Sequence, residues 1–179
     1  EGRADFDPEK GRLAAELSLD GIDITALQRP LPHLVDTLAV GRWKGELRFR
    51  GRDLMSDAPE FATDGRLRST ANVRRGQGLG KAVDLEWAVA INEPIISVYT
   101  FVLLSEQLKV TGAGRLDLKG DGSDLKGKLD VRDLSLVTRD LGLDLGGALQ
   151  APWTLKGRIT SPRVEAGVEA KQLRYADFP

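Results

Sequence analysis

The chain has 179 residues, of which 26 are Lys or Arg and 27 are Asp or Glu, so its formal net charge is −1. This balance argues against a nucleic-acid-binding protein that relies on bulk positive charge. The absence of Cys excludes disulfide scaffolds, zinc ribbons, thiol catalysis and iron–sulfur sites. A single His excludes a multi-histidine metal site and disfavours a Ser-His-Asp triad.

The composition favours an extended β structure over a globular one. Apolar residues make up 41% of the chain, which is too many for a simple disordered tail. Aromatic residues make up only 6%, whereas there are 20 glycines and 30% charged residues. Because aromatic side chains usually supply much of the buried area of a compact core, this mixture indicates a repetitive sheet.

Apolar and charged residues alternate with a period of two along most of the chain, which is the pattern of half-buried strands. The alternation is present at residues 12–20, 42–50, 83–92, 108–119, 125–132, 153–160 and 163–171, and more weakly at 65–74. The polar positions are charged, so one face of the sheet is expected to meet water, as antiparallel sheets allow. Turn signals of a meander lie between the strands, at residues 20–21, 51–53, 120–124, 146–147 and 161–162.

One region has helical periodicity, between residues 24 and 40. Pro30 and Pro32 exclude one continuous helix, so the sequence predicts a short helix at about 32–40 that ends before Gly41 and covers part of the core. The apolar run from Ile95 to Leu104 fits either a fully buried strand or a short buried helix.

Two segments share one template of Gly, charge, apolar, charge, apolar, charge and Gly. They are residues 45–51 and 114–120, and residues 153–157 repeat the second half of the template. Repeats of this kind indicate units that stack along an axis and bury their faces against their neighbours.

The candidate chemical motifs favour structural interpretations. His33 is expected at a surface or helix end and not as a catalytic base, and residues 76–80 lack the Lys-Ser/Thr ending of a phosphate loop. Residues 120–124 lack the Glu that a calcium loop requires at its end. The Arg-rich segment 42–52 is interpreted as the wet face of the sheet, with contact to anionic lipid head groups as the alternative. We therefore expect no catalytic residue, metal or cofactor, and no enzymatic activity.

The chain contains no apolar stretch of the ~20 residues that a transmembrane helix needs, since the longest apolar run is 94–104. Its first residue, Glu1, and its last residues, 175–179, are interpreted as cut points in a longer protein. Residues 1–179 are therefore expected to form a single segment of an extended repetitive structure.

The repeat phrases resemble those of the AsmA-like superfamily. The template Gly-x-Leu-x-Leu-x-Gly is followed by Leu125-Lys-Gly-Lys-Leu-Asp-Val131, and Leu155-Lys-Gly-Arg-Ile-Thr-Ser-Pro-Arg-Val164 runs on to residues 170–175. Within the superfamily these phrases are most similar to those of TamB-like proteins. The segment from Asp23 to Gly41 is similar to the short helix that precedes such a repeat, whereas residues 76–107 match no typical phrase.

The resemblance implies a long, curled, mostly antiparallel sheet, a U-shaped trough or "β-taco" with an apolar concave face. It implies a location in the periplasm of a Gram-negative bacterium, in a parent protein anchored in the inner membrane. It also implies a section of a bridge that shelters phospholipid acyl chains between the inner and outer membranes. The implied partners are phospholipid and, through the parent protein, an Omp85-type outer-membrane barrel of the TamA-like kind, with no nucleic acid.

The scarcity of aromatic residues is consistent with a trough that other molecules fill, since a closed barrel is filled by its own large side chains. We expect the lining to comprise Leu47, Phe49, Val83, Leu85, Trp87, Val110, Leu116, Leu118, Leu129, Val131, Trp153, Leu155 and Ile159. Glycines on the same face are expected to leave room there, namely Gly45, Gly112, Gly114, Gly127 and Gly157. The alternatives are a scaffold for outer-membrane protein assembly by strand addition, and an ordinary β-sandwich without a ligand.

Overall fold

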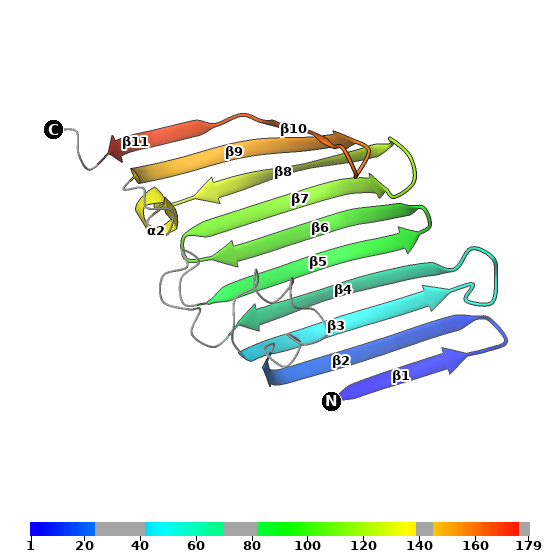
Figure 1. Ribbon diagram of the computed structural model, residues 1–179. Helices are drawn as coiled ribbons and strands as arrows, with labels where there is room; N and C mark the ends of the chain where they lie inside the picture. The colour runs from blue at the N-terminus through cyan, green and yellow to red at the C-terminus, as the bar shows by residue number, and fades with distance from the viewer. Residues whose placement is uncertain (24–41, 70–81, 139–144, 176–179) are drawn as a thin grey trace.

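The computed structural model describes residues 1–23, 42–69, 82–138 and 145–175, and within them eleven strands form one antiparallel sheet (Figure 1). The strands are β1 (Gly2–Asp7), β2 (Arg12–Asp23), β3 (Arg42–Arg52), β4 (Glu60–Ser69), β5 (Val83–Asn92), β6 (Ile95–Ser105), β7 (Leu108–Asp117), β8 (Ser123–Val131), β9 (Leu145–Gly157), β10 (Arg163–Ala166) and β11 (Glu169–Tyr175). They lie in chain order from β1 to β9, and β10 and β11 both pair with β9. The sheet is not closed into a barrel, so the predicted all-β, antiparallel fold class is confirmed.

The register of the strands separates apolar from charged side chains, because directly opposite residues in an antiparallel pair share a face. One line of opposite residues crosses the whole sheet without a charged member: Gly2, Leu17, Leu47, Gly65, Trp87, Phe101, Gly112, Gly127, Trp153 and Ala166. We call the face that carries this line the apolar face. The other face carries Arg48, Arg66 and Lys128, and we call it the charged face.

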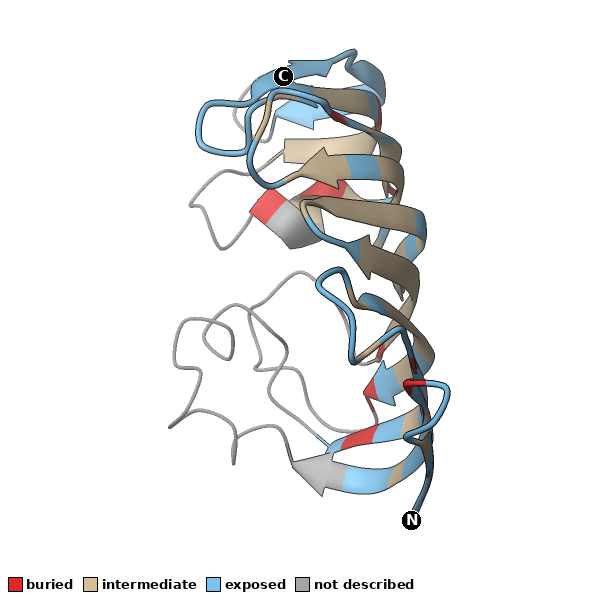
Figure 2. Ribbon diagram, turned by 90° about the vertical axis from the view of Figure 1, so that its right-hand side faces the viewer, coloured by how far each residue is buried: buried red, intermediate tan, exposed pale blue. Residues whose placement is uncertain are grey.

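The sheet curves when it is seen from its side (Figure 2), and the short helix α2 (Leu134–Thr138) lies on the inner side of the curve. Leu134 is buried, and the Thr138 hydroxyl donates a hydrogen bond to the Leu134 carbonyl at 2.9 Å. The backbone N–H of Leu145 donates to the same hydroxyl at 3.4 Å, which connects the helix to β9. The sequence did not predict this helix, and the helix predicted at 32–40 lies outside the described residues.

The large buried side chains of the apolar face gather at one end of the strands, which we call the closed end, and we call the other end the open end. The closed end is a line of buried residues that crosses from strand to strand: Trp43, Ser69, Val83, Ser105 and Val131. Trp43 and Val83, both 3% exposed, are the centre of a small cluster completed by Leu67, Leu85 and Leu103. Large exposed side chains, among them Phe49, lie toward the opposite ends of the strands.

The two copies of the glycine template have the same backbone geometry at their first residue. Gly45 and Gly114 have φ angles of 152° and 140°, which L side chains rarely adopt. A Cβ atom on Gly45 would overlap the carbonyl oxygen of Arg66, and one on Gly114 would overlap that of Asp124. The repeat in the sequence is therefore a repeat of close contacts between neighbouring strands.

The turns predicted at residues 20–21 and 146–147 are wrong, because both segments lie inside strands where the pairing is irregular. Gly21 (φ 70°) lies within β2, where the register with β3 shifts between Leu19 and Ile22. Gly147 (φ 119°) lies within β9, opposite a bulge in β11. A glycine with positive φ marks a bulge as readily as a turn, and the residue type alone does not distinguish them.

The apolar run from Ile95 to Leu104, which fitted a strand or a helix, lies in strand β6. β6 is flanked by β5 and β7 and pairs with both along most of its length. The strand predicted weakly at 65–74 corresponds in part to β4, whose last described residue is Ser69.

Candidate functional site: the apolar face of the sheet

The register places eleven of the thirteen predicted lining residues on the apolar face. They are Leu47, Phe49, Val83, Leu85, Trp87, Val110, Leu116, Leu129, Val131, Trp153 and Leu155. Leu118 and Ile159 lie beyond the ends of β7 and β9, and they are 49% and 40% exposed. The apolar-polar alternation in the sequence continues past Asp117 and Gly157, but the strands end at these residues.

Two tryptophans lie flat on the sheet above glycines of neighbouring strands. A Cβ atom on Gly65 would lie 2.9 Å from the Trp87 ring, and one on Gly127 would lie 2.5 Å from the Trp153 ring. The Trp153 ring also reaches Gly112, where a Cβ atom would lie 3.3 Å from it. An aromatic ring that covers a cross-strand glycine replaces the packing that the glycine lacks.

This arrangement corrects one expectation from the sequence. Gly112 and Gly127 were expected to leave room on the apolar face, but the Trp153 ring occupies the space above both. Gly65, which the sequence did not single out, has the same role beneath Trp87. The sequence does indicate that these glycines lie on the apolar face, because Gly65, Gly112 and Gly127 alternate in phase with the apolar residues of their strands.

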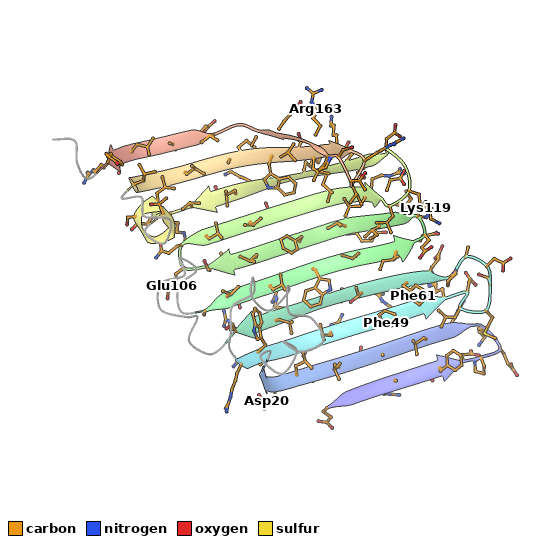
Figure 3. The ribbon with its side chains drawn as sticks, viewed as in Figure 1. Asp20, Phe49, Phe61, Glu106, Lys119 and Arg163 are labelled. Atoms are coloured by element: carbon orange, nitrogen blue, oxygen red, sulfur yellow. The ribbon has the colours of Figure 1, made fainter. Side chains whose placement is uncertain are left out.

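Aromatic residues also meet toward the open end of the face. The rings of Phe49 on β3 and Phe61 on β4 have centroids 5.8 Å apart and are tilted by 33° (Figure 3). This geometry is typical of a favourable aromatic pair. Together with Trp87 on β5 and Trp153 on β9, the pair places aromatic rings at several points across the face.

The charged face of β2 to β5 is a network of ion pairs between neighbouring strands. Arg50 contacts Asp64 at 2.7 Å, Arg66 contacts Glu86 at 2.7 Å, and Arg68 contacts Asp84 at 2.6 Å. The same Arg68 hydrogen bond lowers the pKa of Asp84 below its ordinary value. Exposed ion pairs add little to the stability of the folded sheet. Their main effect is to place opposite charges on directly opposed residues, which favours this register over others.

The charged face is interrupted at β6. β6 is apolar on both sides, so Val102 and Leu104 lie on the charged face beside the ion pairs. A hollow of about 800 Å³ lies there between β6 and β10 and is lined in part by Thr100, Val102, Thr111 and Ala113. β6, whose run of apolar residues has no alternation, therefore interrupts the charged face.

The described residues contain no group of three or more His, Cys, Asp or Glu side chains arranged to hold a metal ion. In the same part of the chain, no helix has the length and apolar character needed to cross a membrane. No protein-family model, curated protein or solved structure matches the chain.

Proposed function

We propose that the apolar face shelters phospholipid acyl chains, as one section of a periplasmic bridge between the inner and outer membranes. The observation that carries the proposal is the uncharged line of residues from Gly2 to Ala166, which crosses the full width of the sheet. With neighbouring strands ~4.8 Å apart, the nine spacings between the ten rows span about 43 Å. A path of this length suits a chain-like apolar ligand better than a compact one.

The exposed area supports an apolar occupant. The chain has an accessible surface of 12526 Å² and a mass of 19.5 kDa. A compact monomer of that mass exposes about 8,500 Å². A single-layer sheet leaves both of its faces exposed, and an occupant on the apolar face would remove part of this excess.

The energetics of acyl binding require no specific polar contact. Each methylene group removed from water contributes roughly 0.8 kcal/mol, so several methylenes along the face give useful affinity. The line consists of Leu, Phe, Trp, Gly and Ala residues, which offer an acyl chain no polar group that would fix its position. Weak, non-directional binding of this kind suits movement along the sheet better than storage at one point.

Photo-crosslinking tests the proposal. A photoreactive amino acid at Leu47 or Leu129 on the apolar face is expected to label phospholipid, whereas the same residue at Arg48 or Lys128 is not. Each matched pair differs by one position in the same strand, so strand, length and label are constant. Equal labelling of lipid from both faces would contradict the proposal, and so would labelling from neither. The Leu129→Asp variant is expected to lose lipid while it retains the sheet's circular dichroism.

The second candidate is a scaffold that receives strands of outer-membrane proteins with an Omp85-type partner. The observation that favours it is that β1 pairs with β2 alone among the described strands, so its other side offers backbone hydrogen-bonding groups to a further strand. Crosslinks from β1 positions to unfolded barrel strands, without lipid labelling from Leu47 or Leu129, would favour this function over lipid shelter.

A further inference from the structure

Trp87 and Trp153 occupy equivalent places on the apolar face. Each lies directly opposite a glycine of the preceding strand, Gly65 on β4 and Gly127 on β8. Each covers that glycine with the same edge of its indole, since Cζ2 of Trp87 lies 2.9 Å from the Cβ position of Gly65, and Cζ2 of Trp153 lies 2.5 Å from that of Gly127. β4 and β8 run in the same direction, because they are four strands apart in an antiparallel sheet in chain order. The two sites can therefore be compared residue by residue.

The chain accepts the indole N–H at one site and not at the other. Trp87 donates its N–H to the hydroxyl of Thr63 at 3.4 Å. Thr63 lies two residues before the covered glycine of β4, and β8 has Leu125 in that place. On the other side of the covered glycine of β8 lies Leu129, which is also aliphatic. Trp153 therefore lacks the side-chain acceptor that Trp87 has.

The N–H of Trp153 has no hydrogen-bond partner in the described segments of the chain, and it is accessible to a ligand. Its nitrogen is bonded to Cε2, which lies 2.6 Å from the Cβ position of Gly127, so the N–H lies close above β8. Among the described residues, Oδ1 of Asp130 is the one side-chain oxygen or nitrogen that is buried without a hydrogen bond, so the indole nitrogen is not buried. A tryptophan N–H in apolar surroundings usually finds an acceptor. Here a ligand on the apolar face has to supply it.

The surroundings of this N–H favour a neutral acceptor over a charged one. Leu125, Leu129 and Gly112 lie beside the ring on the apolar face, whereas Lys126 and Lys128 of the same strand lie on the charged face. An ionised phosphate would lose its hydration at the apolar face without a cation to compensate it, and a carbonyl oxygen costs much less to desolvate. In a phospholipid, the ester carbonyl oxygen is the neutral acceptor directly attached to each acyl chain.

We propose that the Trp153 N–H donates a hydrogen bond to the ester carbonyl oxygen of a phospholipid whose acyl chain lies on the apolar face. The inference rests on the proposed function and adds the place where the ester end of the lipid is held. The hydrocarbon has no acceptor for this N–H, so the lipid is oriented at β8 and β9 and slides over the rest of the face. One neutral hydrogen bond contributes roughly three- to tenfold in affinity, which is too little to stop the lipid from moving on.

Nuclear magnetic resonance of the ¹⁵N-labelled chain tests the contact directly. The chain has three tryptophans, so each indole N–H signal can be assigned from a Trp→Phe variant. The probes are dihexanoyl phosphatidylcholine and its dihexyl ether counterpart, both below their critical micelle concentrations. They differ only in the ester carbonyl groups. The ester lipid is expected to move the Trp153 indole proton downfield, whereas the diether lipid is expected to perturb the methyl signals of the apolar face without that shift.

Binding of the two lipids to matched variants tests the energetics. The native chain is expected to bind the ester lipid roughly three- to tenfold more tightly than the diether lipid. Trp153→Phe keeps a ring above Gly127 but removes the N–H, so it is expected to bring the ratio of the two affinities to about one. Trp87→Phe removes an N–H that is already bonded within the chain, so it is expected to keep the native ratio. Leu125→Thr keeps both tryptophans and supplies the acceptor that Thr63 supplies on β4, so it is expected to lower the ratio.

The outcomes separate this inference from the proposed function. Both lipids binding with equal affinity, and with no selective shift of the Trp153 indole proton, would overturn the hydrogen bond and leave the shelter of acyl chains standing. A ratio that survives both Trp153→Phe and Leu125→Thr would also overturn it. Failure of both lipids to bind to the apolar face would contradict the proposed function itself, and this inference with it.

Discussion

Replacing Gly127 by Ala is expected to destabilise the sheet strongly, and replacing Gly112 by Ala is not. Both glycines lie on the apolar face beneath the Trp153 ring. A methyl group on Gly127 would overlap the Thr111 carbonyl oxygen and lie 2.5 Å from the indole, so backbone and ring would both have to move. A methyl group on Gly112 would meet the indole at 3.3 Å, which a small tilt of the ring relieves.

The magnitudes follow from these distances. Overpacking that requires a backbone shift costs about 2–3 kcal/mol, whereas the Gly112 variant should lie within about 1 kcal/mol of the native chain. Chemical denaturation followed by circular dichroism measures both changes. Adding Trp153→Ala removes the ring but not the carbonyl, so the Gly127 variant should recover only part of its loss in the double-mutant cycle. Equal stabilities of the two glycine variants, or full recovery with Trp153→Ala, would refute the assignment of the clash to the Thr111 carbonyl.

Two further predictions concern the repeat and the charged face. Gly114→Ala forces a side chain into a φ of 140° and against the Asp124 carbonyl, so it is expected to lower stability by about 2 kcal/mol or more. Gly157→Ala is the control, because Gly157 also has a positive φ but its Cβ position has no neighbour within 4 Å. The difference between the two variants measures the clash apart from the φ strain. The Arg68 hydrogen bond lowers the pKa of Asp84 from 3.8, so its contribution is fully present above about pH 4 and is lost as pH falls through the folded-state pKa. Native and Asp84→Asn chains should therefore differ in denaturation midpoint at pH 6 and converge as the pH falls below the folded-state pKa of Asp84, and a difference of the same size across an acid titration would contradict this reasoning.

The faces of the sheet were predictable because alternation is a local signal. A strand such as Arg42–Arg52 specifies its own two faces wherever it pairs, so Leu47 and Phe49 could be assigned to one face without knowledge of their neighbours. The same signal failed for β6, because its run of apolar residues has no alternation to read. The assignment of Val102 to the charged face required the register with β5.

Contacts between strands were beyond the reach of the sequence. Nothing near Gly65 in the chain indicates that Trp87, 22 residues away, covers it. Likewise the positive φ of Gly21 and Gly147 gives bulges inside strands, although their neighbours in the sequence favour turns. The helix α2 has only five residues, too few for a helical period to emerge from its sequence.

The use of the three tryptophans explains how so few aromatic residues suffice for a sheet of this size. Trp43 is buried in the small cluster at the closed end, while Trp87 and Trp153 lie flat over glycines of adjacent strands. A flat ring thickens the sheet by one layer but projects little beyond it, so it does not replace a second sheet or an occupant. The aromatic residues therefore strengthen strand pairing and leave the apolar face available.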